Sequence, residues 1–97
     1  MKNWQTKNSK QLFRALVKLR NVDEAAKFCR DLLTEDEIAE LSNRWLVARR
    51  LDAGDSQRQI AADTSVSLAT VSRVNYWLTR GMGGYRLMLD RLFHHSR

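Results

Sequence analysis

The side chains between Ser56 and Val74 could make hydrogen bonds and charge contacts to a polyanion. The stretch reads SQRQIAADTSVSLATVSRV, and its apolar residues recur at helical spacing among short polar and cationic ones. The residues expected to face outward are small, hydrogen-bonding or cationic, and they are Gln57, Arg58, Ser67, Leu68, Ala69, Thr70, Ser72 and Arg73. A helix that enters the roughly 12 Å wide major groove of DNA needs side chains of these kinds.

Two short helices joined by a tight turn would position these side chains. Ser56-Gln57-Arg58-Gln59 predicts a capping box that opens the first helix, and Ser67 is an N-cap candidate for a second helix to about Leu78. The geometry needs apolar or small residues on the inner side, which are Ile60, Ala61, Val66, Val71 and Val74. Ser65 stands where such turns often carry glycine, which is acceptable if its φ is not positive. Residues 56–78 therefore predict a helix-turn-helix.

The net charge of +6 is concentrated in the part of the chain that contains this stretch. Residues 1–43 hold eight Lys or Arg and seven Asp or Glu, whereas residues 44–97 hold nine Arg, no Lys and four Asp. A basic region attracts nucleic acid by long-range steering, although solubility alone could also explain a few net charges. Gln57 and Ser67 would also stand near helix N-termini, where backbone amides favour phosphate.

The rest of the chain predicts helices only, which gives an all-α fold of six helices in a single domain. Leu12, Leu16 and Leu19 form the apolar stripe of a first helix, together with Phe13 and Val17. A break at Asn21 starts a second helix that ends near Leu33. A capping box over residues 34–37 opens a long third helix over about 35–53, which Gly54 ends and in which Trp45 packs into the core. A C-terminal helix is expected over 85–95.

Several classes of function lack support in the sequence. A single cysteine, Cys29, excludes an internal disulfide and is expected to be a buried apolar residue. No apolar run approaches the roughly 18 residues of a membrane span, and no signal peptide is visible, so a cytoplasmic protein without a membrane is expected. No grouping of carboxylates, serine, cysteine and histidine supports catalysis, and the adjacent His94 and His95 are poor co-ligands for a metal. The sequence therefore predicts neither an enzyme nor a metal or cofactor site.

From Leu33 onward the chain resembles the Trp repressor superfamily. LTEDE, SNR, GDSQRQI and SLATVSR occur in the family's order at nearly the same spacing, over about two-thirds of the chain. The ending RGMGGYRLMLDRL is similar to the YerC/YecD branch, TrpR-related proteins that are predicted regulators. The resemblance implies an intertwined, all-helical homodimer with two reading heads, in which residues 1–54 are the dimerisation helices.

The resemblance also assigns roles to individual residues. The positions that face DNA in the family are Gln57, Arg58, Leu68, Ala69, Thr70 and Ser72 in this chain. In the tryptophan-binding repressor two arginines and a threonine surround the corepressor, and Arg44, Arg73 and Thr34 stand at those positions. Leu33 keeps a pocket-lining leucine. A candidate effector pocket thus comprises Leu33, Thr34, Arg44, Arg73, Val74 and Trp77.

Three departures from the tryptophan-binding pattern affect this pocket. A glycine of the family is Val74 here, a serine is Trp77, and an apolar leucine is Asp31. We hypothesise that Val74 or Trp77 fills part of the site, so that L-tryptophan is not the effector. Trp77 could instead be a packing residue, and Arg44 and Arg73 could bind another anion or pair with an acid such as Asp31.

Two functions from different classes remain open on the sequence. The first is a homodimeric transcriptional regulator, a repressor, that reads a palindromic operator in double-stranded DNA through the major groove. A small-molecule effector of unknown identity would be compatible with it. The alternative is a helical protein-interaction module that uses the helix-turn-helix as a scaffold.

Overall fold

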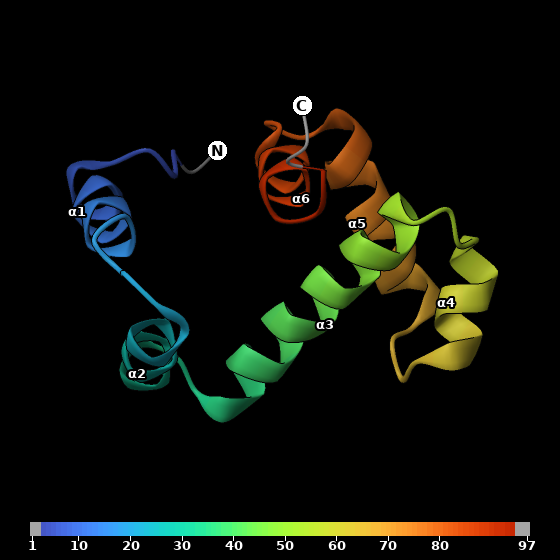
Figure 1. Cartoon of the computed structure of the whole chain (residues 1–97), viewed down its shortest axis with the longest axis horizontal. Helices are drawn as coiled ribbons and strands as arrows, with labels where there is room; N and C mark the ends of the chain where they lie inside the picture. Colours follow the sequence, from blue (N-terminus) through green and yellow to red (C-terminus); the bar gives the residue numbers. More distant parts are fainter. Residues whose placement is uncertain (1–2, 95–97) are drawn as a thin grey trace. The chain divides into compact units, whose positions relative to one another are not determined.

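The computed structural model describes residues 3–94, and all of their regular structure is helical. The helices are α1 (Lys7–Leu16), α2 (Val22–Leu32), α3 (Glu35–Asp52), α4 (Gln57–Asp63), α5 (Leu68–Arg80) and α6 (Gly84–Phe93), shown in Figure 1. The predicted all-α fold of six helices is confirmed. The chain divides into two compact units, one up to Ile38 and the other from Ala39 onward. Its description as a single domain stays a prediction.

Polar side chains cap the N-termini of α2 and α3. The Asn21 side-chain oxygen accepts from the backbone N–H of Glu24 at 2.9 Å. The Thr34 hydroxyl accepts from the N–H of Glu37 at 3.1 Å, and the Glu37 carboxylate accepts from the N–H of Thr34 at 2.9 Å. These bonds satisfy amides that have no partner within the first turn of a helix. The capping box at Thr34 is therefore confirmed.

Gly54 ends α3 in the way that the sequence predicts. Its φ is +100°, a conformation that glycine adopts at no steric cost. Its N–H donates to the carbonyl of Leu51, and the N–H of Asp55 donates to the carbonyl of Arg50. This pair of bonds is the Schellman pattern, which turns the chain sharply toward α4.

The apolar stripe of the first helix runs past the end of α1. The helix ends at Leu16, and tighter turns follow in which Lys18 and Leu19 donate to the carbonyls of Ala15 and Leu16. Val17 lies at the C-cap with 78% of its surface exposed. The expected burial of Cys29 is also wrong, since this residue is only half-buried.

Three smaller expectations about helix ends also differ from the structure. The Ser56 hydroxyl accepts from the N–H of Gln59, but the Gln59 side chain donates to Asp63 and does not accept from the N–H of Ser56, so only half of the predicted capping box forms. Helix α5 continues two residues beyond Leu78 because its C-cap is Gly81. Helix α6 ends at Phe93, and His95 lies outside the described residues.

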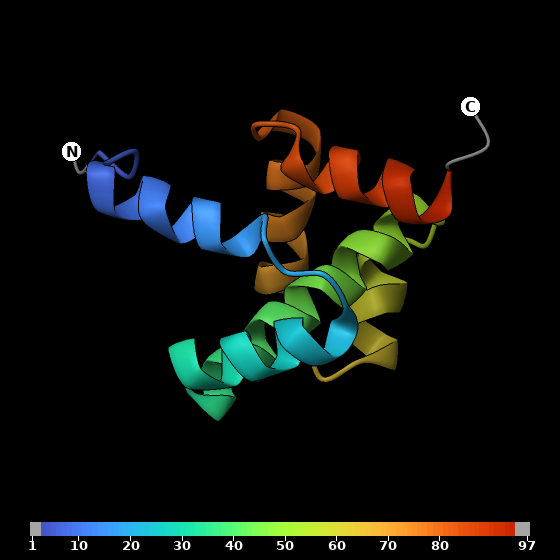
Figure 2. The same cartoon turned by 60° about the vertical axis from the view of Figure 1, so that its left-hand side comes forward.

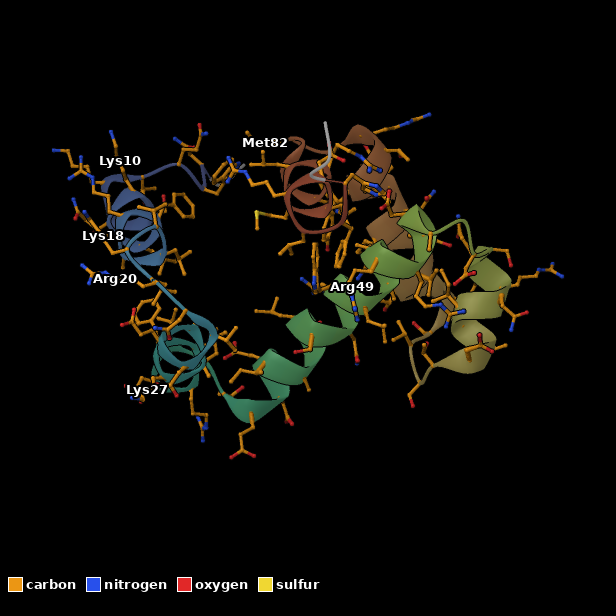
Figure 3. All side chains as sticks on the ribbon, in the orientation of Figure 1. Lys10, Lys18, Arg20, Lys27, Arg49 and Met82 are labelled. Atoms are coloured by element: carbon orange, nitrogen blue, oxygen red, sulfur yellow. The ribbon has the colours of Figure 1, made fainter. Side chains whose placement is uncertain are left out.

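The unit up to Ile38 contains α1 and α2 and has no fully buried residue in either helix. The rings of Trp4 and Phe13 meet edge to face, with centroids 6.1 Å apart. Basic side chains project from this unit into solvent, as the labels in Figure 3 show for Lys10, Lys18, Arg20 and Lys27. Large apolar side chains stay exposed on the same helices, including Val22 at 85%. This unit has therefore no core of its own.

The unit from Ala39 onward is built around one apolar cluster. Its buried members come from α3, α4, α5 and the turn between α4 and α5, and they are Val47, Ala48, Ile60, Val66, Val71 and Val74. Trp45 packs against this cluster, as predicted, and stacks on Tyr85 of α6 with ring centroids 6.3 Å apart. Val47 of α3 is fully buried in this cluster.

Asp52 attaches α6 to the C-terminal end of α3, where Figure 2 shows α6 crossing. One of its carboxylate oxygens accepts from Arg86 at 2.7 Å, and the other lies 2.7 Å from Nε2 of His94. The hydrogen bonds from His94 and then Arg86 hold the pKa of Asp52 below its ordinary value. Leu89, in the middle of α6, is fully buried beside this attachment. None of the helices within residues 3–94 is both long and apolar enough to cross a membrane.

Replacement of Asp52 by asparagine tests the attachment of α6. We expect D52N to lower the free energy of unfolding near pH 7 by about 1 kcal/mol, since both partners are partly exposed to water. A depressed pKa stabilises the fold above the unfolded value of 3.8, and this stabilisation is lost as pH falls through the folded pKa. The difference between wild type and D52N in urea unfolding should therefore shrink below about pH 4. A difference that is independent of pH would contradict the assignment.

Candidate nucleic-acid interface

Helices α4 and α5 form the predicted helix-turn-helix. Ile60 and Val71 are fully buried where the two helices meet, and Val66 of the turn is 7% exposed. Ala61 is half-buried against the same cluster. No residue other than glycine within residues 3–94 has a positive φ, so Ser65 needs no strained backbone. The inner residues that the sequence assigns to this geometry all occupy it.

The outer residues of the pair are mostly open to solvent. Those that are exposed are Arg58, Ser67, Leu68, Ala69, Ser72 and Arg73. Gln57 and Thr70 are half-buried. The structure thus brings all eight predicted outer residues onto one helix pair, six of them on its exposed surface.

Hydrogen bonds already fix four of the polar outer side chains. The Ser67 hydroxyl accepts from the N–H of Thr70 at 3.2 Å and lies 3.1 Å from the Thr70 hydroxyl. The Ser72 hydroxyl donates to the side-chain oxygen of Gln57 at 2.7 Å, which joins α5 to the first turn of α4. Because its oxygen accepts from Ser72, Gln57 has its amide N–H groups left to donate to a ligand.

A cavity of about 290 Å³ lies between α3, α5 and α6. Its lining residues are Arg44, Thr70, Arg73, Val74, Trp77 and Tyr85. The volume is close to the lower limit of roughly 300 Å³ for small-molecule sites. The sequence predicts four of these residues in an effector pocket and misses Thr70 as a lining residue and Tyr85 entirely. Leu33 and Thr34, the other two predicted members, belong to the unit up to Ile38, and their part in an effector pocket stays a prediction.

The two arginines of the cavity differ in their partners. Arg44 pairs with Glu40 one turn earlier at 2.9 Å, so it does pair with an acid, although not with Asp31. Arg73 makes no ion pair within residues 3–94. Burial raises the pKa of the Tyr85 phenol, and the charge of Arg44 opposes that rise. Tyr85 therefore presents a neutral hydroxyl near one paired and one unpaired cation.

Val74 and Trp77 occupy different positions in the cavity wall. Val74 is 3% exposed and belongs to the core, whereas Trp77 is 53% exposed and meets the ring of Tyr76 edge to face. The side chain of Trp77 is thus a wall of the cavity that also faces solvent. Whether either residue excludes L-tryptophan stays a hypothesis.

The aspartates of the unit from Ala39 onward form ion pairs within that unit. Each aspartate from residue 44 to residue 94 is ion-paired: Asp52 and Asp90 with Arg86, and Asp55 and Asp63 with Arg50. Among the arginines that make no ion pair within residues 3–94 are Arg58 and Arg73, both on the helix-turn-helix. Part of the cationic excess of residues 44–97 therefore lies on α4 and α5.

The glycines between α5 and α6 have a structural role. Gly81 caps the end of α5, where an added Cβ would lie 2.3 Å from the Trp77 carbonyl oxygen, and Gly83 begins α6 with φ at +85°. These glycines therefore form the turn between α5 and α6. Residues 3–94 contain no group of three or more histidine, cysteine or acidic side chains that could hold a metal.

Comparison with known proteins places the chain in a family. The family model described as Trp repressor protein matches residues 7–93. The YerC protein of Bacillus subtilis, itself uncharacterised, is 39% identical over 82 residues, which are 84% of this chain and 79% of YerC. The chain therefore belongs to the Trp repressor family, a family of DNA-binding regulators.

Solved structures agree with this assignment. A TrpR-like protein from Eubacterium eligens is 40% identical and superimposes with a TM-score of 0.85 over 92% of each chain. A candidate Trp repressor from Staphylococcus aureus is 35% identical, with a TM-score of 0.85 over 91% of this chain and 88% of that one. Both likenesses extend over nearly the whole fold, so the family resemblance is not confined to the helix-turn-helix.

Proposed function

We propose that this protein is a sequence-specific transcriptional repressor that binds a palindromic DNA operator as a homodimer. The observation that supports this most strongly is the exposed face of α4 and α5, where small and cationic side chains stand over a buried apolar cluster. A helix with such a face fits the major groove, and the buried cluster holds it rigid. Membership of a family of DNA-binding regulators supports the same function.

Within this proposal the outer residues have different tasks. Arg58 and the helix end at Ser67 contact phosphate and set the position of the helix on the duplex. Thr70 and Ser72 contact base edges, and Leu68 or Ala69 meets a thymine methyl group. Gln57 donates from the amide that Ser72 orients. The contacts to bases give sequence preference, and the contacts to phosphate give most of the salt-dependent affinity.

A second copy of the chain accounts for the exposed apolar side chains of α1 and α2. These helices have no buried residue, and their exposed apolar members include Phe13, Leu16, Val17, Val22 and Leu32. Groups of exposed apolar side chains of this kind mark association surfaces. A two-fold dimer would present two copies of α5 to half-sites about one helical turn of DNA apart.

L-tryptophan is not the effector in this proposal. The cavity has about 290 Å³, one of its walls is Trp77, and Val74 stands where the tryptophan-binding pattern has glycine. An indole ring would have to share this space with the Trp77 side chain. Arg44 and Arg73 leave the cavity cationic, which is compatible with an effector that is a smaller anion.

Replacement of Arg58 by alanine tests its contact with phosphate. We expect R58A to weaken binding to every duplex and to reduce the slope of log affinity against log salt by about one per subunit. The measurement is fluorescence anisotropy at several salt concentrations on two unrelated duplexes. Arg49→Ala removes the same charge from α3 and is the matched control, with a slope expected to equal that of wild type. Equal slopes for R58A and wild type would refute the phosphate contact, and absence of salt-dependent DNA binding in wild type would favour the protein-interaction module.

Calorimetry with L-tryptophan tests the assignment of the cavity. We expect no saturable heat for wild type in the micromolar range, because Trp77 and Val74 restrict the space for an indole ring. The variant Trp77→Ser enlarges the cavity at its exposed wall, and it should bind tryptophan more tightly than wild type does. A micromolar isotherm for wild type with one tryptophan per subunit would overturn this part of the proposal.

A further inference from the structure

One arginine of α3 contacts both ends of α4. Arg50 lies in the last turn of α3, and its Nε donates to Asp55 at 2.6 Å. Its Nη2 donates to Asp63 at 2.8 Å. Asp55 immediately precedes the N-cap of α4, and Asp63 is the last residue of that helix. A single guanidinium therefore joins α3 to the residues that flank α4.

The acceptor at the far end of α4 is itself held in place. The second oxygen of Asp63 accepts from Nε2 of Gln59 at 2.7 Å. Hydrogen bonds donated by Arg50 and then Gln59 hold the pKa of Asp63 below its ordinary value, and the hydrogen bonds that Arg50 donates to Asp55 and then Asp63 raise the pKa of Arg50. Arg50 and Asp63 are therefore both charged at neutral pH. We name Arg50, Asp55, Gln59 and Asp63 the α4 clamp.

The geometry of the clamp limits how α4 can turn against α3. A guanidinium is planar and its donors have fixed directions, so two carboxylates bound to it are fixed relative to each other. Helix α4 has only seven residues, and Ile60 is its one fully buried side chain. A helix anchored at one apolar point can rotate about that point, and the bonds of Arg50 to Asp55, just before the helix, and to Asp63, at its last residue, oppose this rotation.

Within residues 3–94 the side chains of the α4 clamp make no hydrogen bond or ion pair with the outer residues, but they hold the helix on which some of these residues lie. Gln57 and Arg58 are in the first turn of α4, between the two carboxylates in sequence. Gln57 also accepts from Ser72, so a movement of α4 would reach the outer surface of α5. The two helix-turn-helix units of a dimer that bind one palindrome need a fixed spacing. A unit rotated from this position would lose contacts in at least one half-site.

We propose that Arg50 is a positioning residue for DNA recognition, which holds α4 and through it α5 at the angle that a palindromic site requires. This role rests on the proposed function. Replacement of Arg50 should therefore lower the affinity for the specific DNA site. It should have less effect on the affinity for unrelated DNA, because contacts with phosphate tolerate a displaced helix-turn-helix. A role in stability alone would instead weaken both kinds of binding together.

Arg50→Met tests the proposal, because methionine keeps an unbranched stem and removes every donor. Affinity is measured on the duplex that wild type prefers, obtained by selection from a random library, and on an unrelated duplex of equal length. We expect R50M to lose at least about tenfold on the preferred duplex and no more than about threefold on the unrelated one. Arg49→Met is the matched control, since it removes the same charge from the adjacent exposed position on α3, labelled in Figure 3, and should bind both duplexes as wild type does.

A second variant keeps the test decisive if R50M does not fold, as judged by its helical circular dichroism. Asp63→Asn removes one charge of the clamp and should cause a smaller loss of the same selective kind. In folded protein the double variant should lose no more than R50M alone, because both changes break one interaction.

The outcomes separate the two proposals. Equal specific affinity for R50M and R49M, or equal losses on both duplexes, would overturn the role of Arg50 and leave the proposed function standing. A wild-type protein that shows no sequence preference would overturn the proposed function, and the role of Arg50 with it.

Discussion

The burial of Ile60 and Val71 against Val47 is the interaction on which the unit from Ala39 onward depends. These side chains come from α4, α5 and α3, and all three are fully removed from water. Each contributes roughly 1.5–3 kcal/mol through apolar burial, which is a large share of the stability of so small a unit. Because the three helices meet at this cluster, the outer face of α5 has a fixed orientation that its own short sequence could not provide.

The charged side chains around this cluster have two roles. The aspartates of the unit join helices: Asp52 holds α6 to α3, while Asp55 and Asp63 hold α4 to α3. Because these aspartates are already ion-paired, Arg58 and Arg73 of the helix-turn-helix make no ion pair within residues 3–94. The charges of these two arginines would therefore attract a polyanion to α4 and α5.

Sequence patterns predict the helices and the inner residues well, because caps and apolar spacing act over three or four residues. Thr34 and Gly54 mark the ends of α3 by local hydrogen bonds, and Ile60 and Val71 follow from helical periodicity. Contacts between distant residues are a different matter. Nothing in the pattern places Tyr85 of α6 against Trp45, or Arg50 against Asp63, because these pairs depend on how helices cross. Local patterns can also have two outcomes. The Gln59 side chain donates to Asp63, four residues later, and so leaves half of the predicted capping box unmade.

Selection from a random duplex library, at near-physiological salt and with no ligand added, tests directly whether α4 and α5 recognise a specific DNA sequence. We expect enrichment of a symmetric motif whose half-sites lie about one helical turn apart, since two fixed copies of α5 would read it without a corepressor. Binding to all duplexes without enrichment of any sequence would contradict the claim that the face of α4 and α5 reads a specific operator.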